Sequence, residues 1–353
     1  MSPTFPLRLL STHRKRRRTL DPEPETGLRV LVSGRPPAHA VAQVDQLVGD
    51  DAAGEAPTGT AFEFRAVIRD PRDVDVIHLL SPDAVIGGPR TAASERLRRA
   101  TAFASHVRRH RIALVQTVTA SKTRTPAERM LDSATTFFAA RSAEQPTPDV
   151  HRTRVIPHSH LGDRFLGYPR ADAVPGRAVM LTSGVFDAAY EAPLKVFAAA
   201  DLPGTTLRLV GRAPAALAAS FARSVGRNAG KIALRDSALS DAERVVEITA
   251  SEFVVIAAPE NPVSYATMML AVSLGRPVLV EETAETAALA TEIGPEWIRT
   301  HPGRLTIATL EASVRALRAK TFTEGPRLSS RAPNPVAAMY RDLYRAAASA
   351  ARR

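Results

Sequence analysis

The chain has 353 residues, enough for two domains of ordinary size, and a formal net charge of +11. Because only 5% of its residues are aromatic while 44% are hydrophobic, its core must be built from Ala, Val, Leu and Ile. The absence of cysteine excludes disulfides and thiolate metal sites, and no apolar run approaches the roughly 18–20 residues that a membrane span needs.

A basic, proline-containing segment opens the chain, and its residues 13–18 read HRKRRR. We expect residues 1–27 to form a disordered basic tail. Such a tail is either a solvated extension or an attachment to an anionic membrane surface, at roughly 1 kcal/mol per basic residue near the headgroups. The first ten residues lack the charge pattern of a signal peptide, which favours a cytoplasmic location. No helix-turn-helix, zinc or aromatic RNA-binding motif is present, so we expect no specific nucleic-acid partner.

After the tail, short β-branched runs alternate with amphipathic segments. The runs predict strands over residues 28–32, 62–67, within 73–83, 112–118, 135–139, 153–156, 178–183, 207–210, 231–234, 253–258 and 278–280. The intervening segments predict helices over residues 38–47, 91–110, 126–132, 191–200, 215–225, from 240, 264–274, from 286, 306–319 and 334–348. Alternation without an internal repeat predicts an α/β fold with parallel, doubly wound sheets.

Residues 251–297 show this pattern most clearly, as strand, tight turn, helix, glycine and strand. Ser264 is predicted to cap the helix, and Gly275 is predicted to end it. Ligands of parallel sheets bind beyond the carboxyl ends of the strands. The free N–H groups of a helix that starts at Ser264 would point at an anion there, with Glu281 and Glu282 following the next strand.

Three segments carry a resemblance to a known family. They are AVSLGRPVLV at 271–280, followed by the acidic pair and EIGPEW; RVIPHSHLGDRF at 154–165; and LRLVGRAP at 207–214. In this order and spacing they resemble the donor-binding half of GT-B-fold glycosyltransferases, the nucleotide-sugar-dependent kind used in bacterial polysaccharide assembly. A further segment, DVDVIHLLSPD at 73–83, resembles the family's DVVHxHWPE, with Asp83 in the place of its final acid.

The resemblance implies two Rossmann-like domains facing each other. It places an acceptor-side domain at 28–167, a nucleotide-sugar-binding domain at 168–330, and a C-terminal helix and tail at 331–353 that cross back onto the first domain. It implies transfer of a sugar from a nucleoside diphosphate sugar to a carbohydrate or lipid-linked acceptor, without a metal or other cofactor. A lipid-linked acceptor would place the protein at the inner face of the membrane as a peripheral protein.

The resemblance also implies roles for individual residues, each of which has a simpler structural explanation. The catalytic candidates are Asp83 and His158; Asp83 could instead be a turn residue, and His158 a hydrogen-bonded junction residue. The donor-binding candidates are His160, Gly184, Gly211, Arg212, Ser264, Glu281 and Glu282. Of these, Arg212 could be a surface arginine and the two glutamates an acidic cluster before a helix.

The sequence departs from the family at the phosphate-binding positions. Asp187 and Tyr190 stand where the family carries an Arg and a Lys, Tyr265 and Ala266 replace its Ser-Gly, and its His-Asn pair is missing after the strand at 112–118. These changes leave a second interpretation open, that of a catalytically degraded relative acting as a partner or scaffold. A nucleotide-sugar epimerase shares the fold, but no matching carboxylate and histidine set is visible. The paired glutamates typical of retaining relatives are also absent, which favours inversion.

Overall fold

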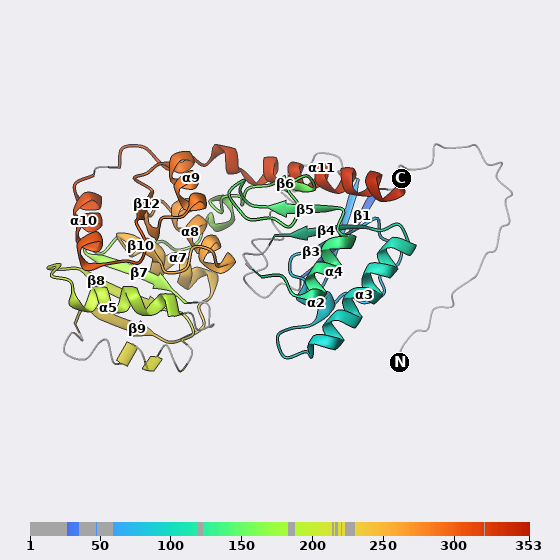
Figure 1. The fold of residues 1–353 in the computed structure, drawn as a ribbon. Helices are drawn as coiled ribbons and strands as arrows, with labels where there is room; N and C mark the ends of the chain where they lie inside the picture. Colours follow the sequence, from blue (N-terminus) through green and yellow to red (C-terminus); the bar gives the residue numbers. More distant parts are fainter. Residues whose placement is uncertain are drawn as a thin grey trace, which may run out of the picture.

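A computed structural model describes residues 27–34, 47, 59–118, 123–182, 188–213, 215, 218–219, 221–222, 230–320 and 322–353. The basic tail lies outside the described residues, as do Gly184 and Asp187 and most of the helices predicted over 38–47 and 215–225. The described chain folds into two lobes, each built on a parallel sheet (Figure 1).

The first sheet has six strands in the order β2-β1-β3-β4-β5-β6. Its strands are β1 (Leu28–Ser33), β2 (Thr60–Arg65), β3 (Val76–Leu79), β4 (Ala113–Thr117), β5 (Phe137–Ala140) and β6 (Thr153–Val155). All neighbouring pairs are parallel, and Val30 of β1 lies opposite Val76 of β3. The helices of this domain are α2 (Asp83–Ile86), α3 (Ala93–Arg109) and α4 (Pro126–Ala134). Alanine and branched aliphatic residues make up most of its core, as the composition predicts, with Phe103, Tyr340 and Tyr344 as aromatic additions.

The second sheet also has six parallel strands, in the order β12-β11-β10-β7-β8-β9. Its strands are β7 (Arg177–Leu181), β8 (Thr206–Val210), β9 (Ile232–Arg235), β10 (Phe253–Ile256), β11 (Val278–Glu281) and β12 (Ile298–His301). Its helices are α5 (Glu191–Ala199), α7 (Asp241–Thr249), α8 (Pro262–Ser273), α9 (Ala284–Ile293) and α10 (Ile307–Arg318). Two apolar clusters cover the two faces of the sheet, so the predicted doubly wound α/β fold is confirmed.

Local sequence explains most helix ends. Ser240 caps α7 through a capping box with Glu243, as predicted. The predicted cap of α8 is wrong: Asn261 caps this helix, and its side-chain oxygen accepts from the Val263 N–H at 2.9 Å. The helix begins earlier because Pro262 suits the first helical position, where its missing N–H costs nothing. Gly275 follows the end of α8 with φ +70°, as predicted.

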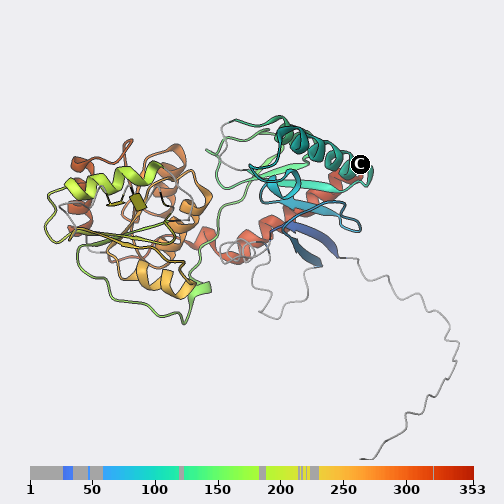
Figure 2. The same ribbon diagram turned by 90° about the horizontal axis from the view of Figure 1, so that it is seen from below.

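The last helix, α11 (Pro333–Arg352), returns from the second lobe to the first sheet (Figure 2). Its buried side chains, among them Val336 and Leu343, pack in one cluster with Val30, Val76 and other residues of β1 to β5. The predicted crossing helix is therefore confirmed. Within the described residues, no helix is long and apolar enough to span a membrane.

A buried polar chain crosses this seam. The His78 ring lies between the Tyr344 hydroxyl, 2.8 Å from Nδ1, and the Thr117 hydroxyl, 2.9 Å from Nε2. Burial lowers the pKa of His78 to about 3, so the ring is neutral near pH 7. The helix, β3 and β4 are thus joined by hydrogen bonds as well as by apolar packing.

Candidate functional site

The strand order fixes where a ligand would bind. In the second sheet the chain adds β8 and β9 on one side of β7, and then β10 to β12 on the other. In parallel sheets of this kind, ligands bind beyond the carboxyl ends of the strands where the strand order reverses, here between β7 and β10. Of the loops that follow these two strands, residues 183–187 lie outside the described part, while the loop after β10 leads directly into α8.

The first turn of α8 lies at this crossover point. Pro262 has no N–H, Asn261 takes the N–H of Val263, and the Tyr265 N–H donates to the Asn261 carbonyl. Among the described residues, the Ser264 N–H has no acceptor, although its residue is only 8% exposed. A buried, unpaired N–H at the positive end of a helix is suited to an anion. Ser264 thus lies where the sequence predicts it, as a backbone donor and not as the cap.

Gly211 and Arg212 follow β8, on the other side of the crossover. Gly211 has φ +116°, and a Cβ there would lie 2.6 Å from the Thr182 carbonyl oxygen. The position requires glycine because the ends of β7 and β8 approach so closely. The Thr182 hydroxyl donates to the Arg212 carbonyl at 2.7 Å, and the Arg212 side chain is exposed beyond it. An exposed cation at a carboxyl strand end is available to an anionic ligand.

The acidic pair lies at the end of β11, which lies next to β10 on the side of the crossover away from β8. Glu281 is the last residue of β11, and Glu282 follows it. The exposed Glu282 carboxylate accepts from the Thr300 hydroxyl at 3.0 Å. Thr283 then caps α9 through a capping box with Thr286. The pair therefore lies at the carboxyl edge of the sheet, with Glu282 held toward the end of β12.

The two histidines lie in the segment that joins the domains. His158 Nδ1 donates to the Ser159 carbonyl at 2.8 Å, and its ring lies 6.0 Å from the Tyr265 ring. Desolvation lowers the pKa of His158 to about 4, and the nearby Arg331 and Arg141 act in the same direction. His160 Nδ1 accepts from the Gly162 N–H at 3.3 Å. His158 therefore adjoins the first turn of α8, whereas the His160 ring contacts its own loop and its N–H donates to the Arg331 carbonyl at 2.7 Å.

Asp83 lies on the first domain, apart from these groups. It is the first residue of α2, and its carboxylate lies 3.4 Å from Arg96 of α3. The preceding loop follows β3, which neighbours β1 at the crossover point of the first sheet. Asp83 thus lies near the carboxyl edge of its own sheet, and no contact with the described residues of the second domain brings it to α8.

Sequence patterns missed a charged cluster between the domains. Arg141, which follows β5, forms a bidentate pair with Glu285 of α9 at 2.5 and 2.8 Å. Its guanidinium lies 4.4 Å from the centre of the Tyr265 ring. On the other side, Arg331 donates to the Tyr265 hydroxyl at 3.4 Å and pairs with Glu292 at 2.9 and 2.6 Å. The available signal was the position of Arg141 at the end of a predicted strand.

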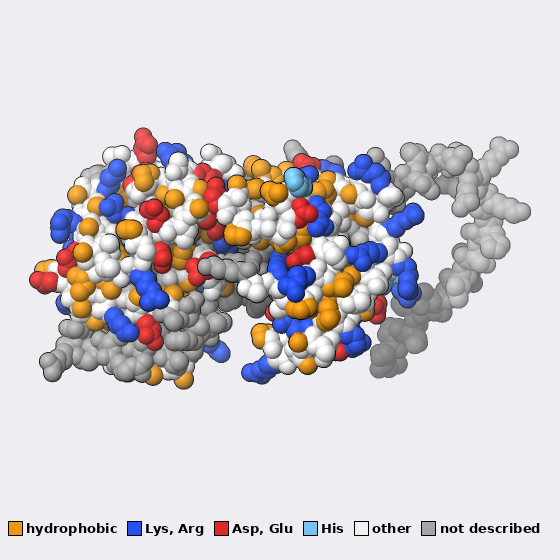
Figure 3. All heavy atoms as spheres, viewed as in Figure 1, with side chains coloured by type: hydrophobic (Ala, Val, Ile, Leu, Met, Phe, Trp, Pro, Cys, Tyr) orange, Lys and Arg blue, Asp and Glu red, His pale blue; other side chains and the backbone are white. Residues whose placement is uncertain are grey.

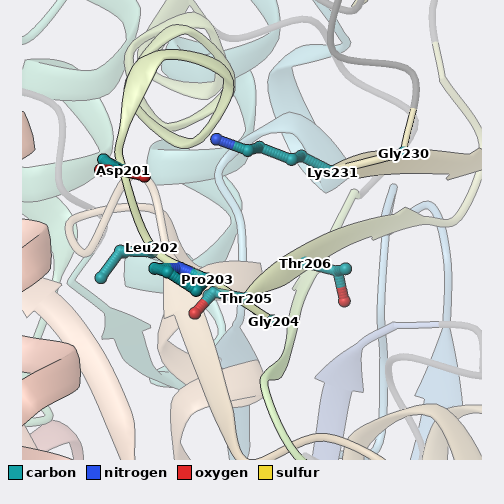
Figure 4. A pocket seen from close by; sticks show the side chains of 8 residues that line it. All are labelled: Asp201, Leu202, Pro203, Gly204, Thr205, Thr206, Gly230 and Lys231. Atoms are coloured by element: carbon teal, nitrogen blue, oxygen red, sulfur yellow. The ribbon is translucent and has the colours of Figure 1, made fainter.

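A hollow lies at another edge of the second domain, away from this site. It has a volume of about 200 Å³ and is lined by residues 201–206, 230 and 231 (Figure 4). These residues lie at or just before the starts of β8 and β9, so they form part of the amino edge of the sheet, opposite the start of α8. The Lys231 ammonium donates to the Ala200 carbonyl at 2.7 Å and is thereby occupied. The hollow offers no comparable set of charged groups.

Neither a basic stripe on the face seen in Figure 3 nor a metal-binding cluster is found in the described part of the chain. Figure 3 shows Lys and Arg side chains spread over both lobes, and the described residues on this face form no single basic stripe. Within the described part of the chain, no cluster of three or more His, Asp and Glu side chains could hold a metal ion. Metal independence remains a prediction.

The two facing sheets, the crossover sites and the returning helix define the GT-B fold. The resemblance to GT-B glycosyltransferases is thereby confirmed at the level of fold. The galactosyltransferase WaaB of the lipopolysaccharide outer core matches with a TM-score of 0.56 at 8% identity, over 90% of this chain and 98% of that chain. HepE from Anabaena, in complex with UDP, matches with a TM-score of 0.55 at 11% identity, over 92% and 97%.

Two proteins similar in sequence have names that state a reaction. A GDP-mannose:glycolipid 4-beta-D-mannosyltransferase from Xanthomonas campestris pv. campestris is 29% identical over 181 residues, and a second protein of that name is 28% identical. Each match spans 51% of this chain and 51% of the relative, about half the length of the curated relatives. No protein-family model matches the chain. A putative UDP-N-acetylglucosamine 2-epimerase from Listeria monocytogenes matches with a TM-score of 0.55 at 10% identity, over 90% of this chain and 96% of that chain. The fold alone therefore does not distinguish a transferase from an epimerase.

Proposed function

We propose that the protein is a glycosyltransferase that moves a sugar from a nucleoside diphosphate sugar to a carbohydrate or lipid-linked acceptor. The observation that carries this proposal is the unpaired Ser264 N–H at the start of α8, at the crossover point of the second sheet. The mannosyltransferase relatives support the class of reaction.

The donor side of the proposal follows from charge. In sugar transfer the nucleoside diphosphate leaves with growing negative charge, which must be stabilised by fixed dipoles or cations. The α8 N-terminus supplies a dipole and a donor N–H, and the exposed Arg212 supplies a cation on the other side of the crossover. We propose that these groups replace a metal ion. Glu281 and Glu282 lie at the same edge and are proposed to contact the donor sugar.

The acceptor side requires a base if the reaction inverts the anomeric centre. Asp83 is the proposed base because its carboxylate lies near the carboxyl edge of the first sheet. A His158 with a pKa of about 4 stays neutral near pH 7 but is a weak base, so we propose that it positions a substrate group by hydrogen bonding. Inversion is proposed from the sequence alone, since Pro262 and Leu270 stand where retaining relatives carry glutamates.

The relatives suggest which substrates to test first. Their name makes GDP-mannose the first donor to test and a glycolipid the first acceptor class. The tail, with five cations in residues 13–18, is proposed to hold the protein at an anionic membrane surface on the cytoplasmic side.

Calorimetry tests the donor site directly. The purified protein would be titrated with GDP, UDP, GDP-mannose and UDP-glucose, with guanosine and uridine as controls that lack phosphate. We expect saturable, micromolar binding of one diphosphate, no binding of its nucleoside, and no change on adding EDTA. Transfer of radiolabelled sugar from the bound donor into a lipid extract would then establish the reaction. Failure of all four nucleotides to bind would refute the proposal.

A non-catalytic partner role remains the second candidate, and one observation favours it. Tyr190, which stands at a family lysine position, is buried with Leu194 and Phe197 in the second domain. It therefore cannot act as a phosphate-binding group. A protein that binds no nucleotide but co-purifies with an active glycosyltransferase would support this candidate. Binding of a donor together with its turnover would exclude it.

A further inference from the structure

The chain lacks a cation at the phosphate-binding positions of the family that it resembles, but an arginine from the first domain lies beside the start of α8. The loop after β7 carries Asp187 at one family position and the buried Tyr190 at the other. Arg141 belongs to the first domain, directly after β5, but its guanidinium makes its charged contacts in the second domain. This inference rests on the proposed function and concerns the same site.

Arg141 lies beside the start of α8. Its Nη2 is 3.5 Å from the carbonyl oxygen of Glu260, the residue before the cap Asn261. Its guanidinium also stacks on the ring of Tyr265, one turn into the helix, at 4.4 Å. These two contacts place a full positive charge next to the helix end that holds the unpaired Ser264 N–H.

The present partner of Arg141 is a carboxylate. Glu285 receives two parallel N–H donors from Arg141, and the two side chains are only 15% and 14% exposed. An arginine fork that fits a carboxylate in this way also fits two oxygens of a phosphate. Glu285 lies in the first turn of α9, where the positive end of that helix would stabilise it if Arg141 were withdrawn.

We propose that Arg141 is a ligand of the donor diphosphate, and that Glu285 occupies it in the absence of the nucleotide. On binding, the guanidinium exchanges the Glu285 carboxylate for phosphate oxygens, with no covalent change and no proton transfer. The Tyr265 ring keeps the guanidinium plane in place during the exchange. The cation missing from the second domain is thus supplied by the first, so that phosphate binding also joins the two domains.

Two variants separate this role from a purely structural one, because they break the same ion pair but leave opposite charges. The measurement is calorimetry with whichever of GDP or UDP the unmodified protein binds. Arg141→Met removes the cation, and we expect affinity to fall at least about tenfold. Glu285→Gln removes the competing anion, and we expect affinity to rise about three- to tenfold. If the pair serves only to hold the domains together, both variants will shift affinity in the same direction, which overturns the inference.

Controls make every outcome decisive. Glu247→Gln breaks a bidentate pair with Arg208, at 3.0 and 2.9 Å, and a contact with Arg235 at 3.2 Å, all within the second domain, and should leave nucleotide affinity unchanged. If Arg141→Met does not fold, as judged by circular dichroism, the sign of the Glu285→Gln effect alone decides. If the unmodified protein binds no nucleotide, the proposed function fails together with the inference. If it binds but Glu285→Gln weakens binding, only the inference fails.

Discussion

Two contacts join the first domain to the C-terminal part of the chain, and they differ in kind. The seam under the first sheet is apolar: α11 buries Val336, Leu343 and Tyr344 against residues of β1 to β5. The contact around Tyr265 is charged, with Arg141 over the face of the ring and Arg331 at its hydroxyl. Exposing a buried apolar surface to water costs free energy that no other contact restores. An arginine in an ion pair, by contrast, can exchange its carboxylate partner for another anion.

The difference shows which part of the C-terminal sequence belongs to the first domain. The helix α11 is last in sequence but belongs to the core of the first domain. The boundary between the domains therefore lies N-terminal to α11 in the sequence. Two segments cross between the domains, and they are hydrogen-bonded to each other: the His160 N–H donates to the Arg331 carbonyl at 2.7 Å, and Arg331 Nη1 donates to the His158 carbonyl at 3.2 Å. These paired crossings lie beside Tyr265, whose hydroxyl accepts from Arg331 at 3.4 Å.

The seam should be the more costly contact to break. Tyr344 is fully buried and contacts His78 and Phe62, so Tyr344→Ala should lower the free energy of unfolding of the first domain by about 3–5 kcal/mol. Urea denaturation followed by circular dichroism would measure the loss. Met339→Ala, on the exposed side of the same helix, should cost far less and serves as the control. Equal effects from the two substitutions would mean that α11 is not part of this core.

The seam should also respond to pH, through His78. Burial holds the folded pKa of His78 at about 3, below its ordinary 6.5, so between these values only the unfolded chain takes up the proton. Stability is therefore fully present above pH 6.5 and falls as pH decreases toward 3. From pH 7 to pH 5 the loss from this group should be about 2 kcal/mol.

His78→Gln isolates that loss from the other titrating groups. His158 changes stability in the same direction, since its pKa is about 4, and it remains in both proteins. Urea midpoints of the parent and the variant, measured at pH 7 and pH 5, should therefore show a smaller pH-dependent decrease in the variant. Identical decreases would contradict a buried, neutral His78.

Sequence patterns predicted the fold well, because alternation and helix ends are local properties. The unit from β10 through α8 to β11 was predicted down to Gly275. The strand β12 was missed because its sequence IRTH lacks a β-branched apolar run. As an edge strand it pairs with a neighbour on one side only, so its sequence is less constrained than that of a central strand. The cap of α8 was misplaced by three residues because proline can occupy the first helical position.

The site was predictable only in part. Strand ends can be read from the sequence, so Gly211, Ser264 and the acidic pair fall at the predicted edge of the sheet. The pair of Arg141 and Glu285 joins residues 144 positions apart in different domains, and no local pattern encodes such a contact. Nor did the sequence indicate that Tyr265, which replaces a small residue of the family, would contact the guanidinium of Arg141.

The N-terminal cap of α8, beside the charged contact, offers a test with a smaller expected effect on stability but a selective effect on binding. Asn261 and Ser240 both cap helices of the second domain, α8 and α7, through side-chain acceptors. Replacing either by Ala should cost about 1 kcal/mol of stability, observable in the fluorescence of Trp297, the single tryptophan of the chain. Only Asn261→Ala should also weaken nucleotide binding, because it frays the turn that presents the Ser264 N–H beside Arg141.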